Sequence, residues 1–326
     1  MNPTQTPATP LFKRISILLE PPHIYGVASL CLIALGSFLF AGTLVPLVEP
    51  ADQTASAANS ITAYETVQIR GKSAIVVDLV TGKVLYQKDP DAQLALASLT
   101  KVPLVLAISE VLDPKKKMTI PYDTAPTGSG GNRLKAGQVW DVQDVINFTL
   151  IASSNEGAQI LADEAASAMR AKYPEAPAED PVLWRMNDLA YDLGLTNTYF
   201  LNVSGLDESE TQSGAYGTAR SVATIMAYAA QRPDPFFGTA IDGLLMADEA
   251  GNLTSAINTN EALGSIPGLI LGKTGYTDLA GGNLAVVFDV GLAHPVVAVV
   301  MGSTRAERFA DMKKLVEAAH SAVAQQ

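Results

Sequence analysis

A hydroxyl and an amine stand three residues apart at the start of a long apolar run. Ser98 and Lys101 lead into apolar residues that continue to Ile108. If this run is helical, the two side chains lie one turn apart on the same face and are close enough to share a proton. Serine becomes a nucleophile when a base takes its proton, and a desolvated lysine can be that base. Ser-x-x-Lys alone is a weak signal, because it occurs about once by chance in a chain of this length.

Two further polar triplets follow along the chain. Ser153-Ser154-Asn155 separates two segments with helical periodicity, and Lys273-Thr274-Gly275 lies in an apolar run that predicts a strand. Each of the patterns Ser-x-x-Lys, Ser-x-Asn and Lys-Thr-Gly occurs once in the chain. Their order is the one that penicillin-recognising serine enzymes use, so the three motifs together are a strong signal.

The residues around these motifs resemble a particular family of serine peptidases. The chain is similar to the D-alanyl-D-alanine carboxypeptidases of peptidase family S11, the low-molecular-mass penicillin-binding proteins, from about residue 72 to residue 319. The similar stretches are Ala97–Lys101, Ile151–Ala158, Asn202–Asp207 and Gly272–Asp278. The resemblance implies an extracytoplasmic enzyme that trims peptidoglycan stem peptides through an acyl-enzyme and is inhibited by β-lactams.

The resemblance also implies roles for individual residues. Ser98 would be the nucleophile, Lys101 its general base, and Ser153 the group that passes a proton to the leaving D-alanine. Asn155 would hold the substrate amide. The other implied substrate-binding residues are Lys273 and Thr274 at the carboxylate, Gly275 beside the substrate backbone, Tyr276 as a backbone oxyanion donor with Ser98, and Arg308 (or Arg305) at the terminal carboxylate.

The pattern of secondary structure agrees with this family. Residues 73–79 and 83–87 predict a hairpin, and residues 269–277, 283–290 and 295–301 predict three more strands. Strands at both ends with helices between them indicate an α+β fold. The resemblance specifies a penicillin-binding-protein or β-lactamase-like transpeptidase fold. It implies a five-stranded antiparallel sheet flanked by helices, with a helical subdomain that carries the middle motif.

The N-terminus predicts a membrane anchor. Residues 27–45 are apolar or small throughout, close to the ~20 residues that a bilayer-spanning helix needs. Lys13 and Arg14 precede the run and acidic residues follow it, which places the N-terminus in the cytoplasm. We therefore expect a cytoplasmic tail (1–24), a transmembrane helix (25–48), a flexible linker (49–68) and an extracytoplasmic serine DD-peptidase domain (69–326). A cleaved signal peptide with a site near Ala55-Ser56-Ala57 is the alternative.

Composition excludes several other classes. The net charge of −11 argues against nucleic-acid binding. His23, His294 and His320 lack the spacing of metal ligands, and we expect neither a metal nor another cofactor. The single cysteine, Cys31, excludes an internal disulfide. The expected partners are the stem-peptide substrate, β-lactam inhibitors and the membrane.

Three related functions remain as alternatives. A class A-like β-lactamase would need a Glu-x-x-Leu-Asn segment, and none occurs between Ser153 and Lys273. A DD-endopeptidase or transpeptidase would use the same motifs with a different acceptor or substrate. A non-catalytic wall-binding relative would keep the scaffold without the chemistry.

Overall fold

The computed structural model describes residues 63–121, 134–291 and 293–324. The expected tail and transmembrane helix, residues 1–48, lie outside this part of the chain. Within it, no helix has both the length and the apolar character needed to cross a bilayer. Residues 63–68, assigned above to the linker, belong to the folded domain, because Tyr64 is buried with its ring centroid 5.7 Å from that of Tyr86.

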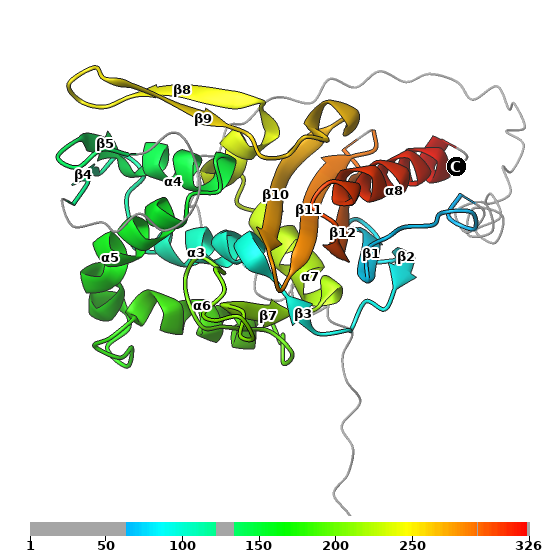
Figure 1. Ribbon diagram of the computed structural model, residues 1–326, viewed down its shortest axis with the longest axis horizontal. Helices are drawn as coiled ribbons and strands as arrows, with labels where there is room; N and C mark the ends of the chain where they lie inside the picture. Colours follow the sequence, from blue (N-terminus) through cyan, green and yellow to red (C-terminus); the bar gives the residue numbers. More distant parts are fainter. Residues whose placement is uncertain (1–62, 122–133, 292, 325–326) are drawn as a thin grey trace, which may run out of the picture. The chain divides into compact units, whose positions relative to one another are not determined.

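The principal sheet has five strands with antiparallel neighbours (Figure 1). Their order in space is β10 (Leu269–Thr277), β11 (Gly281–Asp289), β12 (Pro295–Ser303), β1 (Ser73–Asp78) and β2 (Val84–Lys88). β10, which carries the Lys-Thr-Gly motif, is therefore an edge strand. The α+β class predicted from the sequence is confirmed.

Both faces of this sheet are covered by helices. β1, β11 and β12 are buried at almost every position and have apolar centres, as expected for strands covered on both sides. Because side chains alternate along a strand, one set packs against α8 (Glu307–Ala324), where Met312 and Leu315 are fully buried. The other face contacts α7 (Ala219–Ala230). The N-cap of α7 is Thr218, whose side chain accepts a hydrogen bond from the Ser221 N–H.

A helical part of the domain continues from the edge at β10 (Figure 1). Its centre is α3 (Lys101–Ile108), all of whose residues are buried because α4, α5, α6 and α7 surround it. The surrounding helices are α4 (Val142–Ile151), α5 (Asn155–Lys172) and α6 (Pro181–Asp192).

Short elements connect these layers. The small sheets comprise β3 (Leu94–Ala95), β7 (Ala215–Gly217) and β6 (Tyr199–Phe200); β4 (Lys117–Thr119) and β5 (Val139–Asp141); and β8 (Gly243–Ala247) and β9 (Leu253–Ile257). The 3-10 turns are η1 (Ala97–Thr100), η2 (Asp234–Ala240) and η3 (Leu263–Ser265).

One buried carboxylate joins α8 to the segment before β1 and to the end of β12, which are neighbours in the sheet. Asp311 accepts hydrogen bonds from the Arg70 and Gly71 N–H groups, each at 2.9 Å, and from the Ser303 hydroxyl at 2.8 Å. Its side chain is buried, so these three donors would lose their partner in a dry environment if the carboxylate were removed.

We expect Asp311→Ala to lower the free energy of unfolding by about 3 kcal/mol, since buried donors without an acceptor are costly. Asp311→Asn keeps one acceptor oxygen and should lose less. Urea denaturation of the folded domain would measure both variants. Glu317→Ala, on the exposed side of the same helix, is the control and should change stability by less than about 1 kcal/mol. An equal loss in both alanine variants would contradict this account.

Candidate active site

Ser98 and Lys101 lie together where α3 begins. The 3-10 turn η1 carries Ser98, and Lys101 is the first residue of α3. The Lys101 Nζ donates to Ser98 Oγ at 2.8 Å. The proximity predicted from the spacing is therefore present, although a tight 3-10 turn rather than an α-helical turn holds the serine.

The amine of Lys101 is buried among oxygen atoms from three parts of the chain. Besides Ser98, it donates to Asn155 Oδ1 at 2.7 Å and to the Ser204 carbonyl at 2.9 Å. The side chain has no exposure to solvent. Burial penalises the ammonium form and lowers the pKa of Lys101 to about 7. At neutral pH a large fraction of this lysine is therefore uncharged.

The middle motif occupies the turn between α4 and α5. Ser153 has a φ of 58°, in the left-handed region, and this turn brings it out of the helical path. Ser154 is the N-cap of α5, since its hydroxyl accepts from the Gly157 N–H at 2.9 Å. Asn155 is the first residue of α5. The cap thus fixes the start of the helix that points Asn155 at Lys101.

The third motif lies on β10 and faces the middle motif. The Lys273 Nζ donates to Ser153 Oγ at 2.8 Å and to the Thr274 carbonyl at 2.9 Å. Burial, followed by the charges of Lys101 and Arg308, holds the pKa of Lys273 well below its usual range. The Thr274 hydroxyl lies 2.6 Å from that of Thr259.

Gly275 permits close contact between β10 and η1, the turn that carries Ser98. A Cβ at this position would lie 2.9 Å from the Leu96 carbonyl and 3.2 Å from the Ser98 nitrogen. From the sequence we expected this glycine to make room for substrate; it also makes room for η1. Asn283 holds the same turn from the next strand, because its Nδ2 donates to the Ala95 and Leu96 carbonyls at 3.0 Å each.

The two candidate arginines occupy different positions. Arg308 is buried, and its Nη1 donates to the Gly275 carbonyl at 2.6 Å, while its Nε has no partner among the described residues. Burial, together with the charge of Arg305, lowers the pKa of Arg308 to about 10. The Arg305 guanidinium lies 5.3 Å from the ring centroid of Tyr276, which is 43% exposed.

The site brings three basic side chains together without an ion pair among the residues that the structure describes. Within the described part of the chain, Lys101, Lys273 and Arg308 are all buried and none takes part in an ion pair. Buried charges are costly unless they find a counter-ion. The arrangement therefore favours an anionic ligand.

Several residues complete the site without a role predicted from the sequence. The stretch Asn202–Asp207 resembles the family, but the Ser204 carbonyl acts through its backbone, which has no residue signature. Thr259 and Asn283 carry no motif, and only the tertiary structure brings them to Thr274 and to η1.

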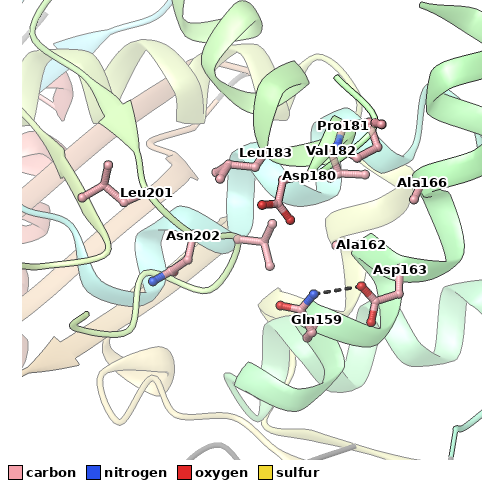
Figure 2. Close-up of a pocket in the computed structure, with 12 residues that line it drawn as sticks. Gln159, Ala162, Asp163, Ala166, Asp180, Pro181, Val182, Leu183, Leu201 and Asn202 are labelled. Carbon is pink, nitrogen blue, oxygen red and sulfur yellow. Dashed lines mark hydrogen bonds between the residues drawn. The ribbon is translucent and has the colours of Figure 1, made fainter. Parts of the chain in front are cut away.

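A pocket is lined in part by the segment that precedes Ser204 (Figure 2). It is bounded by α5, the start of α6 and residues 201–203, and Gln159 donates to Asp163 at 2.9 Å inside it. Asn202 and Val203 line it from the side nearest to Ser204.

Comparison with known sequences gives a consistent result. The sequence profile of the D-alanyl-D-alanine carboxypeptidase family, peptidase family S11, matches residues 57–305. The D-alanyl-D-alanine carboxypeptidase DacF of Bacillus subtilis (strain 168) is 32% identical over 255 residues, which cover 77% of this chain and 62% of DacF. The chain thus spans less than two thirds of the length of this relative.

Solved structures share the fold. The D-alanyl-D-alanine carboxypeptidase from Mycobacterium tuberculosis H37Rv has a TM-score of 0.67 and 25% identity, and the match covers 77% of this chain and 91% of that one. Penicillin-binding protein D2 from Listeria monocytogenes, in its cefotaxime-bound form, has a TM-score of 0.64 and 25% identity, with 78% and 98% covered. With three motifs assembled in one site and a family profile that matches most of its length, the chain belongs to the D-alanyl-D-alanine carboxypeptidase family of serine peptidases.

Proposed function

We propose that this protein is a serine-type D-Ala-D-Ala carboxypeptidase that trims peptidoglycan stem peptides through an acyl-enzyme on Ser98. The observation that carries this proposal is the buried amine of Lys101, 2.8 Å from Ser98 Oγ and with its pKa lowered to about 7. A general base works best when its pKa lies near the operating pH.

The partners of Lys101 orient its lone pair. A neutral amine has two N–H donors and one acceptor position. The Ser204 carbonyl and Asn155 Oδ1 accept from the amine, so they occupy the two donors. The lone pair is then left for Ser98, the one partner of the three that can donate a hydroxyl proton. Deprotonated Lys101 is thereby poised to take the proton from Ser98.

The proposed reaction has two halves. Lys101 takes the Ser98 proton as Oγ bonds to the carbonyl carbon of the penultimate D-alanine, and the backbone N–H groups of Ser98 and Tyr276 stabilise the oxyanion. The C–N bond then breaks, the proton that Lys101 took passes to the nitrogen by way of Ser153, and D-alanine leaves. Water gives a proton to Lys101 as it attacks the acyl carbon, the bond to Ser98 Oγ breaks to release the shortened peptide, and Lys101 returns the proton to Ser98.

The basic side chains of the site suit the negatively charged C-terminal carboxylate of the substrate. The terminal carboxylate of the peptide would find Lys273, Thr274 and Arg308, which supply buried positive charge and a hydroxyl. β10 is the edge strand, so an extended peptide backbone can lie along it. A β-lactam presents a carboxylate and a reactive carbonyl to the same groups, which supports acylation of Ser98 by penicillins.

We also propose that residues 25–48 anchor the protein in the cell membrane as a single span and leave the enzyme domain outside the cytoplasm. The support is the apolar sequence of this segment, with Lys13 and Arg14 before it and Glu49 and Asp52 after it. The substrate is extracytoplasmic as well, since the stem peptide belongs to the cell wall.

We expect Ser98→Ala to abolish labelling by a fluorescent penicillin and release of D-alanine from a pentapeptide substrate, because the variant has no nucleophile. Mass spectrometry of the products would follow the second reaction. Ser321→Ala, on the outer side of α8, is the control and should react like the wild type.

If Ser98→Ala still released D-alanine, Ser98 would not be the nucleophile. If the wild type formed no adduct with penicillin, the proposal that the protein is an enzyme would be wrong and a wall-binding relative would be favoured. Cleavage of crosslinked peptides with no attack on the pentapeptide would identify a DD-endopeptidase instead, and rapid loss of the penicilloyl group would identify a β-lactamase.

We expect the rate constant for acylation by penicillin to rise with pH through about 7, since only neutral Lys101 can accept the proton. One pH unit below this pKa, about a tenth of the lysine is neutral, so the rate should be roughly a tenth of its plateau. Stopped-flow or gel-based labelling from pH 5.5 to 8.5 would test this. A flat profile, or one that falls across this range, would exclude Lys101 as the titrating base.

We expect the full-length protein to remain with the membrane fraction after carbonate extraction, while a variant without residues 1–48 is soluble and is still labelled by penicillin. N-terminal sequencing of the protein purified from cells distinguishes the alternatives. A mature N-terminus just after Ala57 would show that the apolar segment is a cleaved signal peptide.

A further inference from the structure

Asp207 connects two walls of the active site. Its Oδ1 accepts from the Thr277 hydroxyl at 2.9 Å, and its Oδ2 accepts from the Leu279 N–H at 3.3 Å. We propose that Asp207 is a positioning residue for acylation, which sets where the loop of residues 202–207 lies relative to the end of β10. This inference rests on the proposed function, because acylation of Ser98 is the step that it serves.

The loop side of this connection reaches the nucleophile and its base. The Ser204 carbonyl accepts from Lys101, and Asn202 Oδ1 shapes the loop by accepting from the Ser204 and Gly205 N–H groups at 3.1 and 2.7 Å. Gly205 has a φ of +76°, and a Cβ there would lie 2.0 Å from the Ala97 carbonyl. The loop backbone therefore lies directly against the residue that precedes Ser98.

The strand side of the connection reaches the oxyanion donors. Thr277 ends β10 and directly follows Tyr276, whose N–H is the expected second donor to the oxyanion. The Thr277 hydroxyl donates to Asp207 and accepts from the Ala280 N–H at 3.2 Å. The contacts of Thr277 and the Leu279 N–H with Asp207 therefore hold the turn between β10 and β11 against the Asp207 carboxylate.

The loop is held by close packing as well as by hydrogen bonds. Residues 203–205 are buried, and the segment 201–203 lines the pocket of Figure 2. If the Ser204 carbonyl, which holds Lys101, moved by about 1 Å relative to the oxyanion donors, acylation could slow by about 100-fold.

The decisive experiment measures acylation of Ser98 by a fluorescent penicillin in variants of the clasp, which we define as Asp207 and Thr277. Asp207→Ala and Thr277→Val should each lower the second-order rate constant by about 10- to 100-fold, with the melting temperature close to that of the wild type. Because both remove the same link, the double variant should be no slower than the slower single variant.

Conservative variants separate positioning from general stability. Thr277→Ser keeps the hydroxyl and should restore nearly the wild-type rate, and Asp207→Asn should be intermediate, since it keeps one acceptor for Thr277. Asp289→Ala is the matched control, because Asp289 accepts from the Gly291 and His294 N–H groups at the far end of β11. It should be labelled at the wild-type rate.

If the wild type is labelled normally and both Asp207→Ala and Thr277→Val are labelled at the same rate, the positioning role of the clasp is wrong. The proposed function would be unaffected. Additive losses in the double variant, or an equal loss in Asp289→Ala, would also overturn the positioning role. A wild-type protein without label would overturn the proposed function itself. If Asp207→Ala fails to fold, the nearly isosteric Thr277→Val gives the same test.

Discussion

The burial of one amine is the constraint on which the rest of this structure depends. The Lys101 nitrogen lies out of water, in contact with oxygen atoms from η1, α5 and the loop after β6. A buried ammonium without a carboxylate costs several kcal/mol, and the protein avoids this cost by favouring the neutral amine. Burial, followed by the charges of Lys101 and Arg308, likewise lowers the pKa of neighbouring Lys273. Reactivity here is therefore a result of packing.

The surrounding elements are arranged to maintain that packing. α3 is apolar along its length and enclosed by other helices, which keeps water from its first residue. β10 can approach η1 because Gly275 has no side chain, and Asn283, its partner on β11, donates to the Ala95 and Leu96 carbonyls beside the same turn. Ser154 caps α5 and so determines where Asn155 begins. Each of these contacts restricts the nucleophile and its base to one geometry.

The sequence alone predicted the parts of the site that consist of side chains at characteristic spacings. The spacing placed Ser98 and Lys101 one turn apart, and helical periodicity placed Ser153-Ser154-Asn155 between two helices. The order of the motifs and the family resemblance implied that these residues share one site. The Ser204 carbonyl could not be predicted, because every residue has a carbonyl and only the fold decides which one faces Lys101. Thr259 and Asn283 are ordinary polar residues until the sheet brings them to the site. A helical pattern in the sequence could not predict that Ser98 lies in a 3-10 turn rather than an α-helical one. The family resemblance did not decide between Arg305 and Arg308 as the residue that binds the terminal carboxylate.

The strand order of the principal sheet has a consequence for how the protein is made. β1 pairs with β2 on one side and with β12 on the other, and β12 lies more than 200 residues later in the chain. The second pairing can form only after nearly all of the domain has been synthesised. Contacts so distant in sequence are slow to form, since the intervening chain must first be closed into a loop. Ser98 lies within that loop, and the β10 groups that complete its site also come from the far end. A partly synthesised chain therefore cannot assemble the nucleophile with its partners, and catalytic competence appears only when the last third of the domain has joined the first.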